Sequence, residues 1–233
     1  MMKIAIMGAM REEIEPLLEF FGKYQTTEYA GNIYYEASYK NLEIVLAYSK
    51  IGKVNSAITA TVMCEKFKAS KLLFSGVAGA VSDELRVGDL IIADKLVQHD
   101  VDITAFGHPW GFIPESGDFV KSDETLNEIA KKVASNLGIK LRVGSIATGD
   151  QFVASEEKKN WIKSTYHADA LEMEGASVAR VCECFGVPFM ILRAISDAAD
   201  MDAGFSFDEF LVSSAKISAK FLVQMLDELA TNS

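Results

Sequence analysis

The stretch ADALEMEGASVARVCECFGVPFMILRAISD, residues 168–197, decides the fold of this chain. It opens on a short strand-like run that ends in the acidic residues Glu172 and Glu174. Residues 175–185 then have the pattern of a helix, and the glycine and proline that follow at 186 and 188 are typical of its end. The apolar run 189–195 predicts a buried strand. The order strand, helix, strand indicates an α/β fold.

The same alternation continues through the rest of the 233 residues. Apolar runs predict further strands, and apolar residues at helical spacing predict further helices. Segments 33–38 and 43–48 are expected to form an antiparallel pair. The other predicted strands are 3–7, 71–74, 89–93 and 142–148, and further helices are expected to begin near 12, 52, 122 and 206. The sequence has no repeat and no linker, so we expect one α/β domain, residues 1–233, around a mixed sheet.

Composition excludes several classes of protein. Hydrophobic residues make up 49% of the chain and charged residues 24%, which is ordinary for a globular protein. The net charge of −10 weighs against binding to nucleic acid or to a membrane surface. No apolar run approaches the ~20 residues that span a bilayer, and the first apolar segment is too short for a signal peptide. Cys64, Cys182 and Cys184 are expected to be thiols in a reducing compartment, so we expect a cytoplasmic protein.

Carboxylates follow several predicted strands, at the end of the sheet where ligands of α/β folds bind. Each also has a purely structural explanation. Glu13 can be an ordinary acid of a first helical turn, and Glu172 or Glu174 can cap the helix that follows them. Arg193 and Asp197 can form a buried ion pair. An unpaired carboxylate in a buried segment is costly, however, which favours a functional interpretation of Glu172 and Glu174.

Other motifs point to no cofactor. The glycines of Ser75–Gly79 predict a turn that lets the backbone approach a ligand, but the Lys-Ser/Thr ending of a phosphate loop is missing. Only three histidines are present and none has ligand spacing to another, so we expect no metal. The Gly-x-Ser-x-Gly elbow of triad hydrolases and the Gly-x-Gly-x-x-Gly turn of dinucleotide-binding enzymes are absent. The apolar segment 110–114, in a predicted loop, indicates an interface.

Taken together, the segments that end the predicted strands resemble the 5′-methylthioadenosine/S-adenosylhomocysteine nucleosidases, in the nucleoside-phosphorylase-like superfamily. The resemblance runs the whole chain, from Gly8-Ala9-Met10 through KIGKV at 50–54 to SFDEF at 206–210. Segments 105–106 and 111–114 look like members that also cleave 6-amino-6-deoxyfutalosine for menaquinone synthesis. The resemblance implies a three-layer α/β/α sandwich around a mixed, partly barrel-like sheet.

The activity that the resemblance implies is hydrolysis of the N-glycosidic bond of adenine nucleosides modified at the 5′ position, in methionine salvage. The implied substrates are 5′-methylthioadenosine, S-adenosylhomocysteine, 5′-deoxyadenosine and 6-amino-6-deoxyfutalosine. Glu13 matches the base that activates water, Asp197 the acid that protonates N7 of adenine, and Glu174 the carboxylate that grips the ribose hydroxyls. Phe152 would stack on the purine, and Met173 would pack on the sugar.

Further residues match the family's pocket and its subunit interface. Val77 departs from the family, since many members carry Ser there, and this removes a hydroxyl near the site. Ile103, Phe106 and Pro114 match positions that reach into the site of the partner subunit, which implies a homodimer. The other expected pocket residues are Val153, whose backbone would read the purine edge; Ala78 and Gly79 near the sugar and base; Ser196 beside the acid; Met10, Ile51 and Phe207 around the 5′ substituent; and Arg193, which we expect to hold a carboxylate.

Two alternatives stay open. A phosphorylase of the same fold would use phosphate in place of water, but Glu13 would repel a phosphate dianion. A non-catalytic nucleoside sensor would need neither Glu13 nor Asp197. For hydrolysis, Asp197 must carry a proton while Glu13 and Glu174 are ionised, so their surroundings must separate their pKa values. The preferred substrate cannot be ranked from the residue types, because apolar pockets discriminate weakly.

Overall fold

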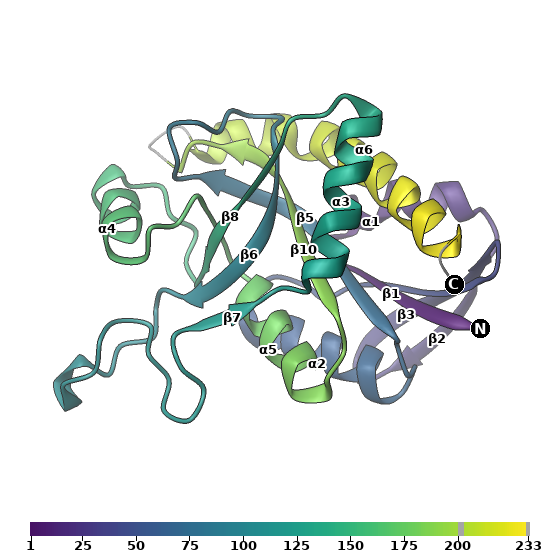
Figure 1. The fold of residues 1–233 in the computed structure, drawn as a ribbon, viewed down its shortest axis with the longest axis horizontal. Coiled ribbons are helices and arrows are strands. Elements are labelled where there is room, and N and C mark those ends of the chain that lie inside the picture. The colour runs from purple at the N-terminus through teal and green to yellow at the C-terminus, as the bar shows by residue number, and fades with distance from the viewer. Residues whose placement is uncertain (200–202, 232–233) are drawn as a thin grey trace.

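The computed structural model describes residues 1–199 and 203–231, and its strands form one mixed sheet (Figure 1). The strands are β1 Met2–Gly8, β2 Gln25–Tyr29, β3 Asn32–Tyr39, β4 Leu42–Tyr48, β5 Lys71–Ala80, β6 Leu90–Gln98, β7 Phe119–Lys121, β8 Leu141–Thr148, β9 Ala170–Glu172 and β10 Phe189–Asp197. Strands β5, β10, β6, β8 and β9 pair in a closed ring, because β5 pairs with both β10 and β9. The predicted mixed, partly barrel-like sheet is confirmed.

Helices cover both faces of this sheet, as the three-layer prediction requires. They are α1 Arg11–Phe21, α2 Lys53–Glu65, α3 Glu124–Leu137, α4 Glu156–Tyr166, α5 Gly175–Phe185 and α6 Ala203–Thr231, with a short 3₁₀ turn η1 at Thr104–Phe106. Helices α2 and α5 share one apolar core with the sheet, and α1, α3 and α6 share the other (Figure 1). Among the helices of the described residues, none is both long and apolar enough to cross a bilayer.

The alternation of side chains along β1 explains why both layers form. Ile4 and Ile6 lie in the core with α1 and α6, whereas Ala5 and Met7 lie in the core with α2 and α5. A strand buried on both faces is apolar throughout, and β10 has the same character, with all of its residues buried.

Several element boundaries differ from the prediction. Segment 75–79, predicted as a turn, continues β5, because its backbone pairs with β10 and its end pairs with β9. Helix α3 is capped by Asp123, whose side chain accepts from the amide of Leu126, and not by Ser122. Helix α6 begins at Ala203, before the capping box predicted at 206–209. Elements β2, β7 and α4 were not predicted, since β2 is mostly exposed and polar and α4 is rich in charge.

Candidate active site

One cavity lies at the carboxyl ends of β1, β5, β9 and β10. This is the position expected of a small-molecule site in an α/β protein. Of the residues predicted for the site, it gathers Glu13, Asp197, Glu174, Met173, Phe152, Val153, Gly79, Ala78, Val77, Ser196, Met10, Ile51 and Phe207. It is also lined by Ala9, Gln151, Leu171 and Glu172, which were not among the predicted site residues.

Glu13 enters the cavity from the first turn of α1. Its Oε2 accepts from the amides of Ala9 at 2.6 Å and Met10 at 2.9 Å, and its Oε1 accepts from the amide of Val77 at 3.1 Å. The Glu13 carboxylate therefore accepts hydrogen bonds from amides at the start of its helix, as expected of an ordinary acid in a first helical turn. It also lines the cavity. Burial raises the pKa of Glu13, and Arg193 and the three amides oppose that rise.

Glycines of β5 make room for the two acids that face them. A Cβ on Gly76 would lie 2.8 Å from Oε1 of Glu13, and a Cβ on Gly79 would lie 2.8 Å from Oδ1 of Asp197. Any larger residue at either position would displace a carboxylate. The glycines of this strand thus serve the close approach of side chains, and not the turn that the sequence suggested.

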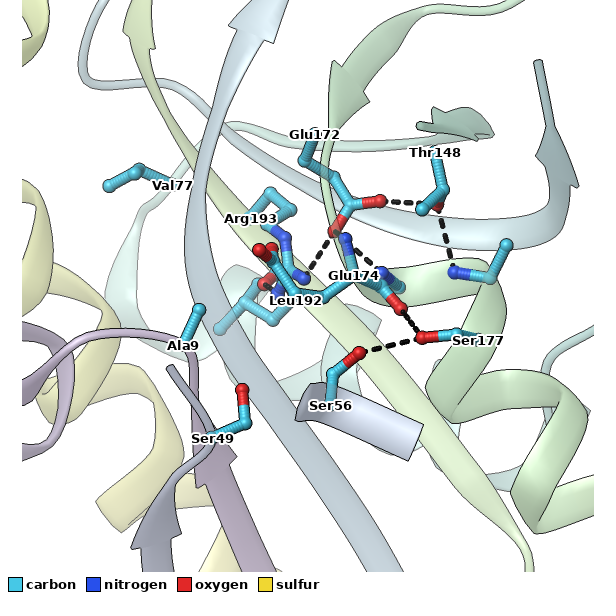
Figure 2. A network of polar contacts seen from close by, with 12 residues as sticks. Ala9, Ser49, Ser56, Val77, Thr148, Glu172, Glu174, Ser177, Leu192 and Arg193 are labelled. Atoms are coloured by element: carbon cyan, nitrogen blue, oxygen red, sulfur yellow. Dashed lines mark hydrogen bonds and ion pairs between the residues drawn. The ribbon is translucent and has the colours of Figure 1, made fainter. Parts of the chain in front are cut away.

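Glu172 and Glu174 have different surroundings, because β9 ends at Glu172 and Glu174 is the N-cap of α5. Oε2 of Glu172 accepts from the amides of Glu174 at 3.1 Å and Gly175 at 2.7 Å and from Nη2 of Arg193 at 2.6 Å (Figure 2). Its other oxygen accepts a short hydrogen bond from the Thr148 hydroxyl. Glu172 is therefore the residue whose side chain caps α5, and it also pairs with the buried guanidinium of Arg193. The Glu174 side chain is not used for capping and lines the cavity.

Glu174 is held by one backbone amide in the described contacts. Its Oε1 accepts from the Gly52 amide, just before α2, at 2.8 Å. Burial and the neighbouring Glu172 raise the pKa of Glu174 to about 8, although Arg193 and the Gly52 amide oppose that rise. The raised pKa favours the protonated form of Glu174, whereas the mechanism expected from the sequence uses the ionised form.

Asp197 ends β10 and is 3% exposed. Its Oδ2 accepts from the Ser196 hydroxyl at 2.8 Å, and its Oδ1 accepts from the Ala199 amide at 2.8 Å. Arg193, four residues earlier on the same strand, pairs with Glu172 and stacks its guanidinium 4.1 Å from the centroid of the Phe74 ring. The buried ion pair considered for Arg193 is thus formed with Glu172.

Apolar side chains form the outer wall of the cavity. The rings of Phe152 and Phe207 meet edge to face, with their centroids 5.9 Å apart. Phe152 is 53% exposed and Ile51 51% exposed, which places both at the mouth. A flat apolar ligand can pack against these side chains, in the cavity that also contains the buried acids.

Four predicted residues do not line the cavity: Arg193, which pairs with Glu172, and the three residues expected at a subunit interface. Ile103, Phe106 and Pro114 belong to the connection between β6 and β7, which projects from the body of the molecule (Figure 1). Phe106 is 82% exposed. Within that connection Trp110 packs edge to face on Trp161 of α4, so the apolar segment 110–114 is partly covered by its own chain.

Comparison with known proteins gives matches along almost the whole chain. The family model described as the phosphorylase superfamily matches residues 3–227. The aminodeoxyfutalosine nucleosidase of Campylobacter jejuni is 60% identical over 229 residues, which cover 98% of this chain and 100% of that protein.

Solved structures give the same result. The structure of a futalosine hydrolase mutant of Helicobacter pylori has a TM-score of 0.97 and 54% identity, and covers 98% of this chain and 100% of its own. The 5′-methylthioadenosine/S-adenosylhomocysteine nucleosidase of Helicobacter pylori with butyl-thio-DADMe-Immucillin-A has a TM-score of 0.97 and 55% identity, over 98% of this chain and 99% of its own. This chain belongs to the phosphorylase superfamily and, within it, to the 5′-methylthioadenosine/S-adenosylhomocysteine and aminodeoxyfutalosine nucleosidases.

Proposed function

We propose that this protein is an N-glycosidase that uses water to release the purine from adenine nucleosides modified at the 5′ position. The relatives' names supply the substrate classes: 5′-methylthioadenosine, S-adenosylhomocysteine and aminodeoxyfutalosine. To these we add 5′-deoxyadenosine, which shares their adenine and ribose. The observation that carries the proposal is the convergence of Glu13, Glu174 and Asp197, from separate elements, on one cavity.

Each of these groups has a task in breaking the bond between C1′ and the purine nitrogen. Asp197 gives its proton to N7 of the purine, so that the bond electrons leave with a neutral base. The ribose is then a cation, and Glu174 holds its hydroxyls. Glu13 takes a proton from water as the hydroxide adds to C1′. Glu13 then releases that proton to solvent while Asp197 takes one back, so the protons balance over one turnover. The raised pKa of Glu13 suits it to this task, because a base works best with a pKa near the operating pH.

Water is favoured over phosphate by the charge of the cavity. Among its described lining residues there is no lysine and no arginine, and the nearby guanidinium of Arg193 is bound to Glu172. Phosphate binding needs convergent cations or amides, and an ionised carboxylate repels a dianion. The deciding assay follows adenine release from 5′-methylthioadenosine with and without phosphate. Release that required phosphate would sink the hydrolase proposal.

The same assay on Asp197→Asn separates an enzyme from a sensor. We expect turnover to fall at least ~100-fold, the range that a general acid contributes, while nucleoside binding persists. Near wild-type turnover would refute the role of Asp197. Turnover of the four nucleosides on one enzyme preparation then ranks the substrates.

We also propose that the chain, as one domain over residues 1–233, acts as a homodimer. Val54 and Ile58 on α2 are 69% and 46% exposed, four residues apart on one helical face. With Phe106 they offer apolar surface for a second copy, whose Ile103, Phe106 and Pro114 would then reach the site. Light scattering at assay concentration tests this, and a fully active monomer would refute it. The free thiols of Cys64, Cys182 and Cys184 suit the reducing cytoplasm, where we place the protein.

A further inference from the structure

Three charged residues form a closed ring of contacts beside the cavity. Nζ of Lys53 lies 2.6 Å from Oδ1 of Asp100, and both side chains are largely buried. Oδ2 of Asp100 accepts from the backbone amide of Asp150 at 2.9 Å. Oδ1 of Asp150 accepts from the backbone amide of Lys53 at 2.8 Å, which closes the ring. None of the three lines the cavity itself.

The ring joins three segments that are far apart in the sequence, and the segments of Lys53 and Asp150 supply residues that line the cavity. Lys53 is the first residue of α2, Asp100 follows β6 and Asp150 follows β8. Asp150 is followed directly by residues 151–153, which line the cavity. Burial raises the pKa of Asp100, but its hydrogen bonds with Lys53 and Asp150 outweigh burial and leave that pKa below its usual range. The lowered pKa favours the ionised form of Asp100 at neutral pH.

The residue next to the ring is the one that holds Glu174. Gly52 has a φ of 99°, and its amide donates to Oε1 of Glu174 while the following amide, that of Lys53, donates to Asp150. A Cβ on Gly52 would lie 3.1 Å from Oδ1 of Asp150, so the Asp150 carboxylate is packed against this peptide. Consecutive amides at the start of α2 thus bind two carboxylates, one in the ring and one in the site.

A second set of hydrogen bonds joins the start of α2 to the start of α5. The Ser177 hydroxyl donates to the Glu174 carbonyl at 2.7 Å and lies 2.6 Å from the Ser56 hydroxyl (Figure 2). The Ser56 hydroxyl in turn lies 3.0 Å from the Lys53 carbonyl. The start of α2 is therefore fixed to the backbone of Glu174 through serines and to its side chain through the Gly52 amide.

We propose that Lys53, Asp100 and Asp150 are positioning residues for ribose recognition, which fix the Gly52 amide and through it the carboxyl group of Glu174. This inference rests on the proposed function, since it takes Glu174 to hold the ribose hydroxyls. Without the Asp150 carboxylate, the peptide at Gly52 can rotate and Glu174 loses its amide. A displacement of about 1 Å in such a group lowers rate on the order of 100-fold.

The test compares Asp150→Ala with Asp150→Asn, on 5′-methylthioadenosine and on its 3′-deoxy analogue. Asparagine keeps an oxygen that accepts from the Lys53 amide, whereas alanine removes it. Asp123→Ala is the control, because the Asp123 carboxylate also accepts from a backbone amide in the first turn of a helix, and that helix, α3, does not border the cavity. Thermal melting of each variant reports folding.

We expect Asp150→Ala to lower kcat/KM by about 10- to 100-fold on the normal substrate and by a smaller factor on the 3′-deoxy analogue, which lacks one of the hydroxyls that Glu174 is proposed to hold. Asp150→Asn should keep most of the activity, and Asp123→Ala should lower the melting temperature but not kcat/KM. An equal loss on both substrates would mean a general structural role and would overturn the inference, as would an unaffected Asp150→Ala.

If Asp150→Ala does not fold, Lys53→Met provides the same comparison, because it opens the ring and keeps the backbone amide. Lys53→Met should also lower kcat/KM more on 5′-methylthioadenosine than on the 3′-deoxy analogue. An equal fall on the two substrates would overturn the inference. Failure of the proposed function is a separate result, since wild-type protein would then release no adenine from either nucleoside.

Discussion

Gly76→Ala adds one methyl group against Glu13, the proposed general base. The new Cβ would lie 2.8 Å from Oε1 of Glu13 and 3.1 Å from Nη1 of Arg193, whereas ordinary contact begins at 3.4 Å. The φ of Gly76 lies outside the left-handed region, so alanine fits the backbone of β5 without strain. The perturbation therefore acts on the carboxylate and not on the fold of the strand.

The size of the effect follows from how Glu13 is held. Its Oε1 has to move by about 0.6 Å to relieve the contact, and its hydrogen bond from the Val77 amide is already 3.1 Å long. The movement breaks that bond and, in the proposed mechanism, moves the Glu13 carboxylate away from the attacking water. Since a misplacement of about 1 Å lowers rate on the order of 100-fold, we expect kcat to fall about 10- to 100-fold.

The assay measures kcat and KM from adenine release, with thermal melting to show that the variant is folded. We expect a small change in KM, because the purine and ribose contacts are untouched. The control is the same substitution in a Glu13→Gln background, where the base is already lost and a further fall of less than twofold is expected. A folded Gly76→Ala enzyme with kcat within twofold of wild type would refute the assignment of Glu13 as a tightly held base.

Three further predictions concern stability. Arg193→Met leaves Glu172 buried without its cation, and chemical denaturation should show a loss of about 3–5 kcal/mol. The pKa of Glu174 is raised to about 8 in the folded protein, so the stability that it contributes is present below pH 4.5 and is lost as pH rises towards 8; Glu174→Gln should flatten that fall in the free energy of unfolding. Burial lowers the pKa of His99, so below pH 6.5 the unfolded chain binds a proton at this residue that the folded chain does not bind, and stability falls with pH. His99→Phe should reduce that loss of stability as pH falls through 6.5. Unchanged slopes of unfolding free energy against pH in these two variants would contradict the respective assignments.

The sequence predicted the alternation of strands and helices because buried strands appear as apolar runs. β10 is the clearest case, since all of its residues are buried. β2 escaped prediction because its sequence QTTEY has no apolar face, and its order comes from pairing with β3. Segment 75–79 was assigned to a turn from its glycines, yet pairing with β10 and β9 keeps it extended. Local preference was overridden by tertiary contact in both cases.

The sequence predicted which residues line the candidate site better than it predicted the contacts among them. Residues at the ends of β1, β5 and β10 gather in the cavity as the topology of α/β sheets requires. Which of Glu172 and Glu174 takes Arg193 depends on where β9 stops, and no local pattern marks that point. The contacts among Lys53, Asp100 and Asp150 join residues 47 to 97 positions apart, so only the folded chain reveals them.

The charge of the site connects its chemistry with its stability. Glu13, Glu172, Glu174 and Asp197 are all buried near the cavity, and the guanidinium of Arg193 is bound to Glu172. Burial raises the pKa values of Glu13 and Glu174, and the neighbouring Glu172 adds to the rise at Glu174. A ribosyl cation brings positive charge next to these carboxyl groups as the glycosidic bond breaks, so the attraction is greatest in the transition state. A phosphate dianion would add negative charge beside the same groups instead, and the acids that line the cavity therefore favour both cleavage of the bond and water as the nucleophile.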